Sequence, residues 1–174
     1  MNTNSKWLLG SMVSALALTA TALPIAAFGR DLERSKSPPR LEGTWTVEIT
    51  PYDCETGDRF PLTIKAYHTF TAGGAVIEST SGKTFQPGQR SAGHGFWERT
   101  GRRSFRAVFE GFVLFDSDPG AQPFYQRGVQ RFDQGIEFVD ATHWQSDALV
   151  TFTNEAGEVV PPSGCASVAA ERME

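Results

Sequence analysis

The sequence lacks the motifs that mark common catalytic and metal-binding sites. It has only three histidines, and none stands in a His-X-His or His-Glu-X-X-His spacing that would hold a metal ion. It has no Gly-X-Ser-X-Gly turn for a serine nucleophile and no glycine-rich loop that would cradle a phosphate before a helix. We therefore expect no metal and no cofactor. A non-enzymatic role is favoured, and the sequence leaves an enzymatic one open.

An excess of positive charge is also lacking, since the formal net charge is −4. Nucleic acids and anionic membranes require a clustered positive surface, so neither is expected as a partner. Arg99, Arg102, Arg103 and Arg106 do cluster, but beside a predicted turn, where a solvated hairpin end accounts for them.

Long hydrophobic runs are missing, apart from one near the N-terminus. Met12–Ala22 is shorter than the roughly 20 apolar residues of a membrane span. A cation, Lys6, precedes it, and small residues around Ala27 suit a signal peptidase. We therefore predict a signal peptide over residues 1–27, cleaved near Ala27, and a secreted or periplasmic protein with no membrane span in its mature form.

The remaining chain has the size of one domain. Residues 28–40 are charged and end in a Ser-Pro-Pro-Arg segment, which predicts a flexible leader before a domain over residues 41–174. Cysteine is scarce as well. Cys54 and Cys165 are the only two, and an even number in an exported chain indicates a disulfide. Two free thiols are the alternative.

Short runs of alternating apolar and polar residues, separated by turn residues, make up most of the sequence after residue 40. This period of two is typical of strands with one buried face. Turns are predicted at Gly73-Gly74, Gly101, Asp133-Gln134-Gly135 and Ala156-Gly157. The predicted strands are Gly43–Thr50, Leu62–Phe70, Ala75–Thr80, Gly93–Thr100, Ser104–Phe115, Phe124–Phe132, Ile136–Trp144, Asp147–Thr153 and Cys165–Arg172.

The short connections between these strands predict an all-β fold, a single antiparallel meander of eight or nine strands. Closing the meander into a small barrel removes its exposed edges. A Cys54–Cys165 disulfide fits closure, because it would join the first strand to the last. A two-sheet sandwich is the alternative. Two connections, Ser81–Ala92 and Asp116–Pro123, are longer than turns require and are expected at the barrel mouth.

Gly43-Thr44-Trp45 opens the first predicted strand and resembles the Gly-X-Trp signature of the calycins, the lipocalin-like barrels. The resemblance implies that Trp45 closes one end of the barrel, stacked against a basic side chain near the last strand, and Arg172 is placed for this. The sequence departs from lipocalins in lacking a Thr-Asp-Tyr motif near the seventh strand and a C-terminal helix. Barrels of the allene-oxide-cyclase or dirigent type are similar in size and strand count.

A barrel of this size is either filled by side chains or holds one small ligand. Polar residues among apolar neighbours on a strand face would orient a ligand if they face inward. On the long strand from Ser104, the face that carries Arg106 and Glu110 is either the interior or the solvent side. The candidate ligand-binding residues are His68, Glu78, Trp97, Arg106, Glu110, Phe112 and Tyr125.

Three functional hypotheses follow. The first is a lipocalin-like protein that binds a small apolar or amphipathic molecule. The second is a cofactor-free isomerase or cyclase, whose cavity fixes a reactive conformer beside one inward acid or histidine. The third is an interaction module with a filled barrel, which uses its outer face or the Ser81–Ala92 loop. The sequence does not predict the oligomeric state.

Overall fold

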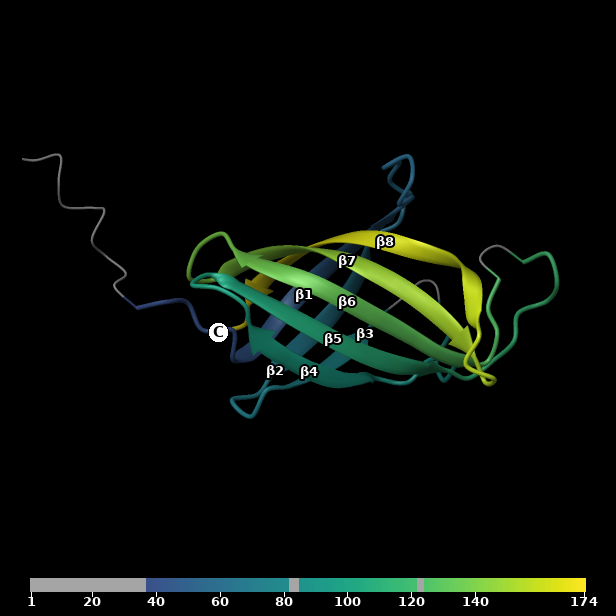
Figure 1. Cartoon of the computed structure of the whole chain (residues 1–174), viewed down its shortest axis with the longest axis horizontal. Coiled ribbons are helices and arrows are strands. Elements are labelled where there is room, and N and C mark those ends of the chain that lie inside the picture. The colour runs from purple at the N-terminus through teal and green to yellow at the C-terminus, as the bar shows by residue number, and fades with distance from the viewer. Residues whose placement is uncertain (1–36, 82–84, 122–123) are drawn as a thin grey trace, which may run out of the picture. The chain divides into compact units, whose positions relative to one another are not determined.

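The computed structural model describes residues 37–81, 85–121 and 124–174. The predicted signal peptide and residues 28–36 of the predicted leader lie outside the described residues. The described residues form a closed antiparallel barrel, which confirms the predicted fold class (Figure 1). Its eight strands are β1 (Gly43–Tyr52), β2 (Ile64–Phe70), β3 (Ala75–Thr80), β4 (Gly93–Arg99), β5 (Ser104–Val113), β6 (Gly128–Phe138), β7 (His143–Asn154) and β8 (Val159–Arg172).

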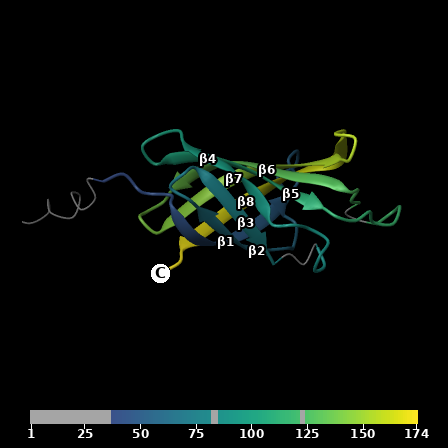
Figure 2. The same ribbon diagram turned by 90° about the horizontal axis from the view of Figure 1, so that it is seen from below.

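Each strand pairs with the next one along the chain, and β8 pairs back with β1. Figure 2 shows the barrel from below, with β1, β2 and β3 next to one another. The register between the first and last strands places Trp45 opposite Arg172 and Tyr52 opposite Cys165. The meander is therefore continuous, and the sandwich alternative is wrong.

The predicted turn at Asp133-Gln134-Gly135 is wrong, because these residues lie in the middle of β6. Tertiary contacts override their turn propensity. The Arg106 guanidinium donates two hydrogen bonds to the Asp133 carboxylate on the outer face, and Gln134 accepts one from the Ser146 hydroxyl inside. The predicted strand Ile136–Trp144 is instead divided by a turn over residues 139–142, its start belonging to β6 and its end to β7. Three predicted strands thus become two, which reduces nine predicted strands to eight.

The last strand also begins earlier than predicted, at Val159 rather than Cys165. Its N-terminal part contains Pro161 and Pro162, which lack the N–H group that a strand ladder uses. The pairing of β7 with β8 accordingly shifts register between Val150 and Phe152. This irregularity disguised the first six of the 14 residues of β8 in the sequence.

Short and long connections lie at opposite ends of the barrel. The turns after β2, β4 and β6 are at one end, here called the closed end, together with the start of β1. The connections after β1, β3 and β5 are longer and lie at the other end, here called the open end, together with the β7–β8 turn. Both long predicted loops are therefore at the same end.

The closed end is filled by large apolar side chains packed edge to face around Trp45, whose ring centroid lies 5.6 Å from that of Phe138 and 6.0 Å from that of Trp144. The Arg172 guanidinium lies 4.2 Å from the centre of the Trp45 ring. It also donates hydrogen bonds to the backbone carbonyls of Glu42 and Arg40. This is the stacking that the calycin resemblance implies.

We expect Arg172→Met to lower the free energy of unfolding by about 2 kcal/mol, because it removes a cation–π contact and two charge-assisted hydrogen bonds while keeping an apolar stem. Urea unfolding followed by tryptophan fluorescence measures the change. The matched control is Arg59→Met, which alters an exposed side chain in the β1–β2 connection and should change stability by less than about 0.5 kcal/mol. Equal effects of the two substitutions would contradict this role of Arg172.

Candidate functional site

An apolar cavity of about 460 Å³, here called the chamber, opens between the strands at the open end. Its wall is formed mainly by aliphatic and aromatic side chains from five strands and three connections. The sequence places them there because inward residues alternate along β1, β2, β6, β7 and β8. The lining residues are Ile49, Pro51, Phe60, Leu62, Ile64, Phe85, Tyr125, Gln130, Phe132, Val150, Phe152, Gly164, Cys165 and Ala166.

Tyr125 joins this wall to the two long connections of the open end. Its ring centroid lies 5.0 Å from that of Phe85, 5.7 Å from that of Phe115 and 5.4 Å from that of Phe152. Burial raises the pKa of Tyr125 to about 12, so its hydroxyl stays neutral at physiological pH. This cluster packs Phe85 of the β3–β4 connection against Tyr125 of the β5–β6 connection, and Tyr125 in turn against Phe152 of β7.

A smaller cavity of about 30 Å³ adjoins the first one, and its lining includes four polar residues beside four apolar ones. It shares five lining residues with the large cavity, namely Ile49, Ile64, Phe85, Gln130 and Phe132. It adds Glu78, Thr80 and Arg90. The apolar chamber therefore has a polar region at one side, large enough for about one water molecule or one polar ligand group.

Arg90 organises this polar region from the end of the Ser81–Ala92 connection. Its Nη1 donates to Glu78 Oε2 at 2.8 Å and to the Ser91 carbonyl at 3.0 Å, and its Nε donates to Gln130 Oε1 at 2.5 Å. The side chains of Arg90 and Glu78 are 3% and 2% exposed. The result is a buried, hydrogen-bonded polar cluster of three side chains, here called the Glu78–Arg90–Gln130 cluster.

Two glycines make room for this cluster. A Cβ on Gly111 would lie 2.9 Å from both Cζ and Nη2 of Arg90, and a Cβ on Gly93 would lie 2.6 Å from Glu78 Oε2. Arg90 Nη2 is buried against Gly111 and has no hydrogen-bond partner among the described residues. No guanidinium N–H group of Arg90 is thus both free and open to the cavity.

Glu78 is the acidic member of the cluster. Burial raises its pKa, and the opposing effect of the Arg90 guanidinium is smaller. It also accepts a backbone hydrogen bond from Gly93. The carboxyl group is therefore held in place by partners on β4 and in the preceding loop, and it faces the small cavity with its hydrogen-bonding capacity largely used.

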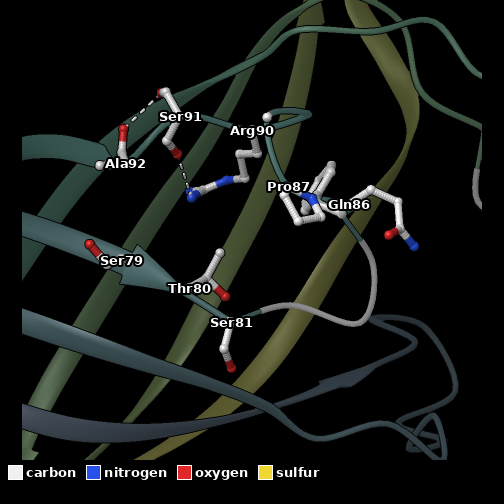
Figure 3. Close-up of a pocket in the computed structure, with 10 residues that line it drawn as sticks. Ser79, Thr80, Ser81, Gln86, Pro87, Arg90, Ser91 and Ala92 are labelled. Atoms are coloured by element: carbon white, nitrogen blue, oxygen red, sulfur yellow. Dashed lines mark hydrogen bonds between the residues drawn. The ribbon is translucent and has the colours of Figure 1, made fainter.

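A separate hollow of about 560 Å³ lies between the end of β3 and the segment before β4 (Figure 3). Hydroxyl and amide side chains, among them Ser79, Ser81 and Gln86, make it more polar than the chamber. Arg90 contributes to its wall as well. Its mixed lining suits water better than an apolar ligand, so the chamber is the better candidate binding site.

His68 is buried in the barrel interior but lines none of these three cavities. Its ring centroid lies 5.1 Å from that of Phe109 and 6.1 Å from that of Trp144. Burial, with a smaller contribution from Arg90, lowers the pKa of His68 to about 3, so the imidazole is neutral. Neither ring nitrogen has a hydrogen-bond partner among the described residues. His68 is therefore a core residue.

The predicted ligand-binding set is divided by the structure. Tyr125 lines the chamber and Glu78 its polar region. Trp97 instead packs at the closed end, where its Nε1 donates to the Thr71 carbonyl at 3.0 Å. Among the seven candidates, Glu78 and Tyr125 thus stand beside a cavity, whereas Trp97 and His68 pack in the core.

Arg106, Glu110 and Phe112 require a correction, because they lie on the outer face of β5. Arg106 forms an ion pair with Asp133 at 2.5 Å, and Glu110 forms one with Arg131 at 2.7 Å. Phe112 is 63% exposed. The inward positions of β5 are taken by buried residues at the alternate positions, Phe105, Ala107, Phe109, Gly111 and Val113.

Arg90 and Gln130 are absent from the predicted set. Gln130 alternates with Phe132 on one strand face, and this polar residue among apolar neighbours was the signal that could have identified it. Arg90 lies in a Gly-, Pro- and Ser-rich loop without alternation. No periodic pattern could show that its side chain turns into the barrel.

The described residues contain neither a membrane-spanning helix nor a cluster of metal-ion ligands. None of their helices is long and apolar enough to cross a membrane. The described part of the chain also contains no group of three or more His, Cys, Asp or Glu side chains placed to hold a metal ion.

No protein-family model and no curated protein sequence matches this chain. Among solved structures, the barrel is similar to that of EF1p2_mFAP2b bound to DFHBI. The two share 14% sequence identity with a TM-score of 0.47, over 76% of this chain and 94% of that one. At this level of similarity the comparison supports no statement about the function of this chain.

Proposed function

We propose that this protein binds a small apolar or amphipathic molecule in the chamber at the open end of its barrel. The observation that carries the proposal is the cavity of about 460 Å³, whose wall is mainly apolar and includes Gln130 and Tyr125 as residues with polar side-chain groups. Binding pockets for small molecules fall in this size range and combine apolar walls with a few placed polar groups. The structure contains the predicted Cys54–Cys165 disulfide. This bond supports the further proposal that the protein is exported, since disulfides persist in oxidising compartments.

The other two hypotheses have less support. An isomerase or cyclase needs an ionisable group that faces the chamber and is free to move a proton. Glu78 is the ionisable group of the polar region, and it is engaged by Arg90 and by the Gly93 backbone. The interaction module was expected to have a filled barrel, and the chamber argues against that.

The test is to fill the chamber from a position that tolerates a side chain. Gly164 lines the chamber opposite Val150, and a Cβ built on Gly164 meets no atom within 4 Å. Gly164→Phe therefore places an aromatic ring in the chamber without a backbone clash. We expect wild-type protein to bind the neutral lipophilic dye Nile red with enhanced fluorescence. Gly164→Phe should weaken that binding at least about tenfold, because the ring takes the volume that the ligand needs.

Gly135→Phe is the matched control. Gly135 is an exposed residue of β6, and a Cβ there also meets no atom within 4 Å. This variant should bind Nile red with an affinity within about twofold of wild type, since surface substitutions change little. Absence of dye binding to wild type, or equal binding to all three proteins, would contradict a ligand chamber.

A further inference from the structure

The polar region of the chamber offers one kind of hydrogen-bonding group to a ligand, and the geometry of Arg90 decides which. A guanidinium has only N–H donors, so the Gln130 side-chain atom that faces Arg90 Nε at 2.5 Å must be the carbonyl oxygen. This fixes the orientation of the amide. The Nε2 group of Gln130, with two N–H donors, is then left for the chamber, the larger of the two cavities that Gln130 lines.

The guanidinium itself has no donor open to a ligand, although its buried Nη2 is without a hydrogen-bond partner among the described residues. Nε bonds to Gln130, Nη1 bonds to Glu78 and the Ser91 carbonyl, and Nη2 is buried against Gly111. Arg90 is the only cationic residue among the described residues that line the chamber and its polar region, and Glu78 balances its charge. A buried anionic ligand would therefore find no free positive partner, which makes its desolvation costly.

The other donors near the chamber are hydroxyl groups. The Thr80 hydroxyl donates to the Lys65 carbonyl. Tyr125 lines the chamber but not the small cavity, and its hydroxyl is not part of the Glu78–Arg90–Gln130 cluster. The amide of Gln130 is thus the donor that stands between the apolar chamber and its polar region.

We propose that the chamber takes a neutral ligand with a carbonyl group, whose oxygen accepts a hydrogen bond from Nε2 of Gln130 while the apolar part of the ligand occupies the chamber. This inference rests on the proposed binding function and specifies the ligand class. Arg90 acts as a positioning residue, because it holds the Gln130 amide with its donors toward the ligand. Glu78 holds Arg90 in turn.

The test compares three probes of similar skeleton, measured by displacement of Nile red. Butyrophenone carries a neutral carbonyl, butylbenzene has none, and phenylbutyrate carries a carboxylate. We expect Gln130→Leu to weaken butyrophenone binding about fivefold, the usual worth of one net hydrogen bond. Butylbenzene should bind both proteins with affinities within about twofold. Phenylbutyrate should bind wild type more weakly than butyrophenone does.

Gln130→Leu also removes the hydrogen-bond partner of Arg90 Nε, so a second variant keeps that bond. In Gln130→Glu the carboxylate still accepts from Arg90 but presents no N–H donor. Butyrophenone affinity should fall by a similar factor in this variant while butylbenzene affinity is kept. The control is the exposed substitution Gln145→Leu, which should leave both affinities unchanged. Tyr125→Phe removes the other side-chain donor of the chamber wall and tests whether that hydroxyl binds the carbonyl instead.

The outcomes separate the two proposals. If wild type binds neither butylbenzene nor butyrophenone, the proposed binding function fails. If both bind and the Gln130 variants affect them equally or not at all, the binding function stands and the carbonyl inference fails. A specific loss of butyrophenone in Tyr125→Phe would assign the donor to Tyr125. Tighter binding of phenylbutyrate than butyrophenone would show that the ligand class is anionic and overturn the inference.

Discussion

Replacement of Cys54 and Cys165 by alanine is expected to lower the free energy of unfolding by about 4 kcal/mol. The disulfide joins residues separated by 111 positions, so it closes nearly the whole barrel into one loop. In the chain-entropy model, a loop of this length restricts the unfolded chain enough to contribute about 4–5 kcal/mol. Among the described residues, it is the only covalent tie between the β1–β2 connection and β8.

Urea unfolding of oxidised wild type and of the double variant measures this loss. Wild type under a reducing agent should fall to the stability of the variant, whereas the variant should not respond to the reducing agent. A loss below about 1 kcal/mol would contradict the entropic argument, because typical native disulfides contribute 2–4 kcal/mol. Cys165 also lines the chamber, so Nile red binding should be measured on both proteins to separate stability from ligand affinity.

Acid is expected to destabilise the barrel strongly through His68. The folded state holds this imidazole neutral with a pKa of about 3, against 6.5 for an unperturbed histidine. Below pH 6.5 the unfolded chain therefore binds a proton that the folded protein does not. The contribution of the neutral His68 imidazole to the free energy of unfolding is fully present above pH 6.5. It is lost as the pH falls toward about 3, by roughly 1 kcal/mol for each pH unit. The total loss is a large part of the stability of an ordinary domain.

His68→Leu should remove this acid dependence. It should also be at least as stable as wild type at pH 7, because it deletes two buried nitrogens without partners. Glu78 has the opposite effect on stability in acid. Its pKa is raised in the folded state, so the folded protein binds this proton more readily than the unfolded chain, which favours folding as the pH falls. Since wild type and variant share Glu78, the difference between their stability curves isolates His68.

Chemical unfolding at a series of pH values measures both curves. His94→Gln is the matched control, since His94 is exposed on β4, and this variant should keep the acid dependence of wild type. Parallel curves for wild type and His68→Leu would show that the neutral imidazole is not what makes the barrel acid-sensitive.

The alternation of apolar residues determined the architecture because a period of two describes one strand face without reference to any other strand. It predicted the strands that carry Trp45, Phe70 and Val76 close to their observed bounds. Short connections then predicted the meander, and the need to protect sheet edges predicted closure. The same local information wrongly predicted a turn at Asp133-Gln134-Gly135. These residues continue β6, because the pairing of β6 with its neighbours outweighs turn propensity.

The disulfide that joins the first strand region to the last, and the barrel that it helps to close, were therefore determined by the sequence itself. Which face of β5 is inward was decided by the tertiary structure, because Phe109 and Phe112 give both faces an aromatic residue. On the outer face, Arg106 pairs with Asp133 and Glu98, and Glu110 pairs with Arg131. The tertiary structure also decided where the chamber and the Glu78–Arg90–Gln130 cluster form. Their parts come from separate strands and a loop, and a cavity exists only where such segments meet in space.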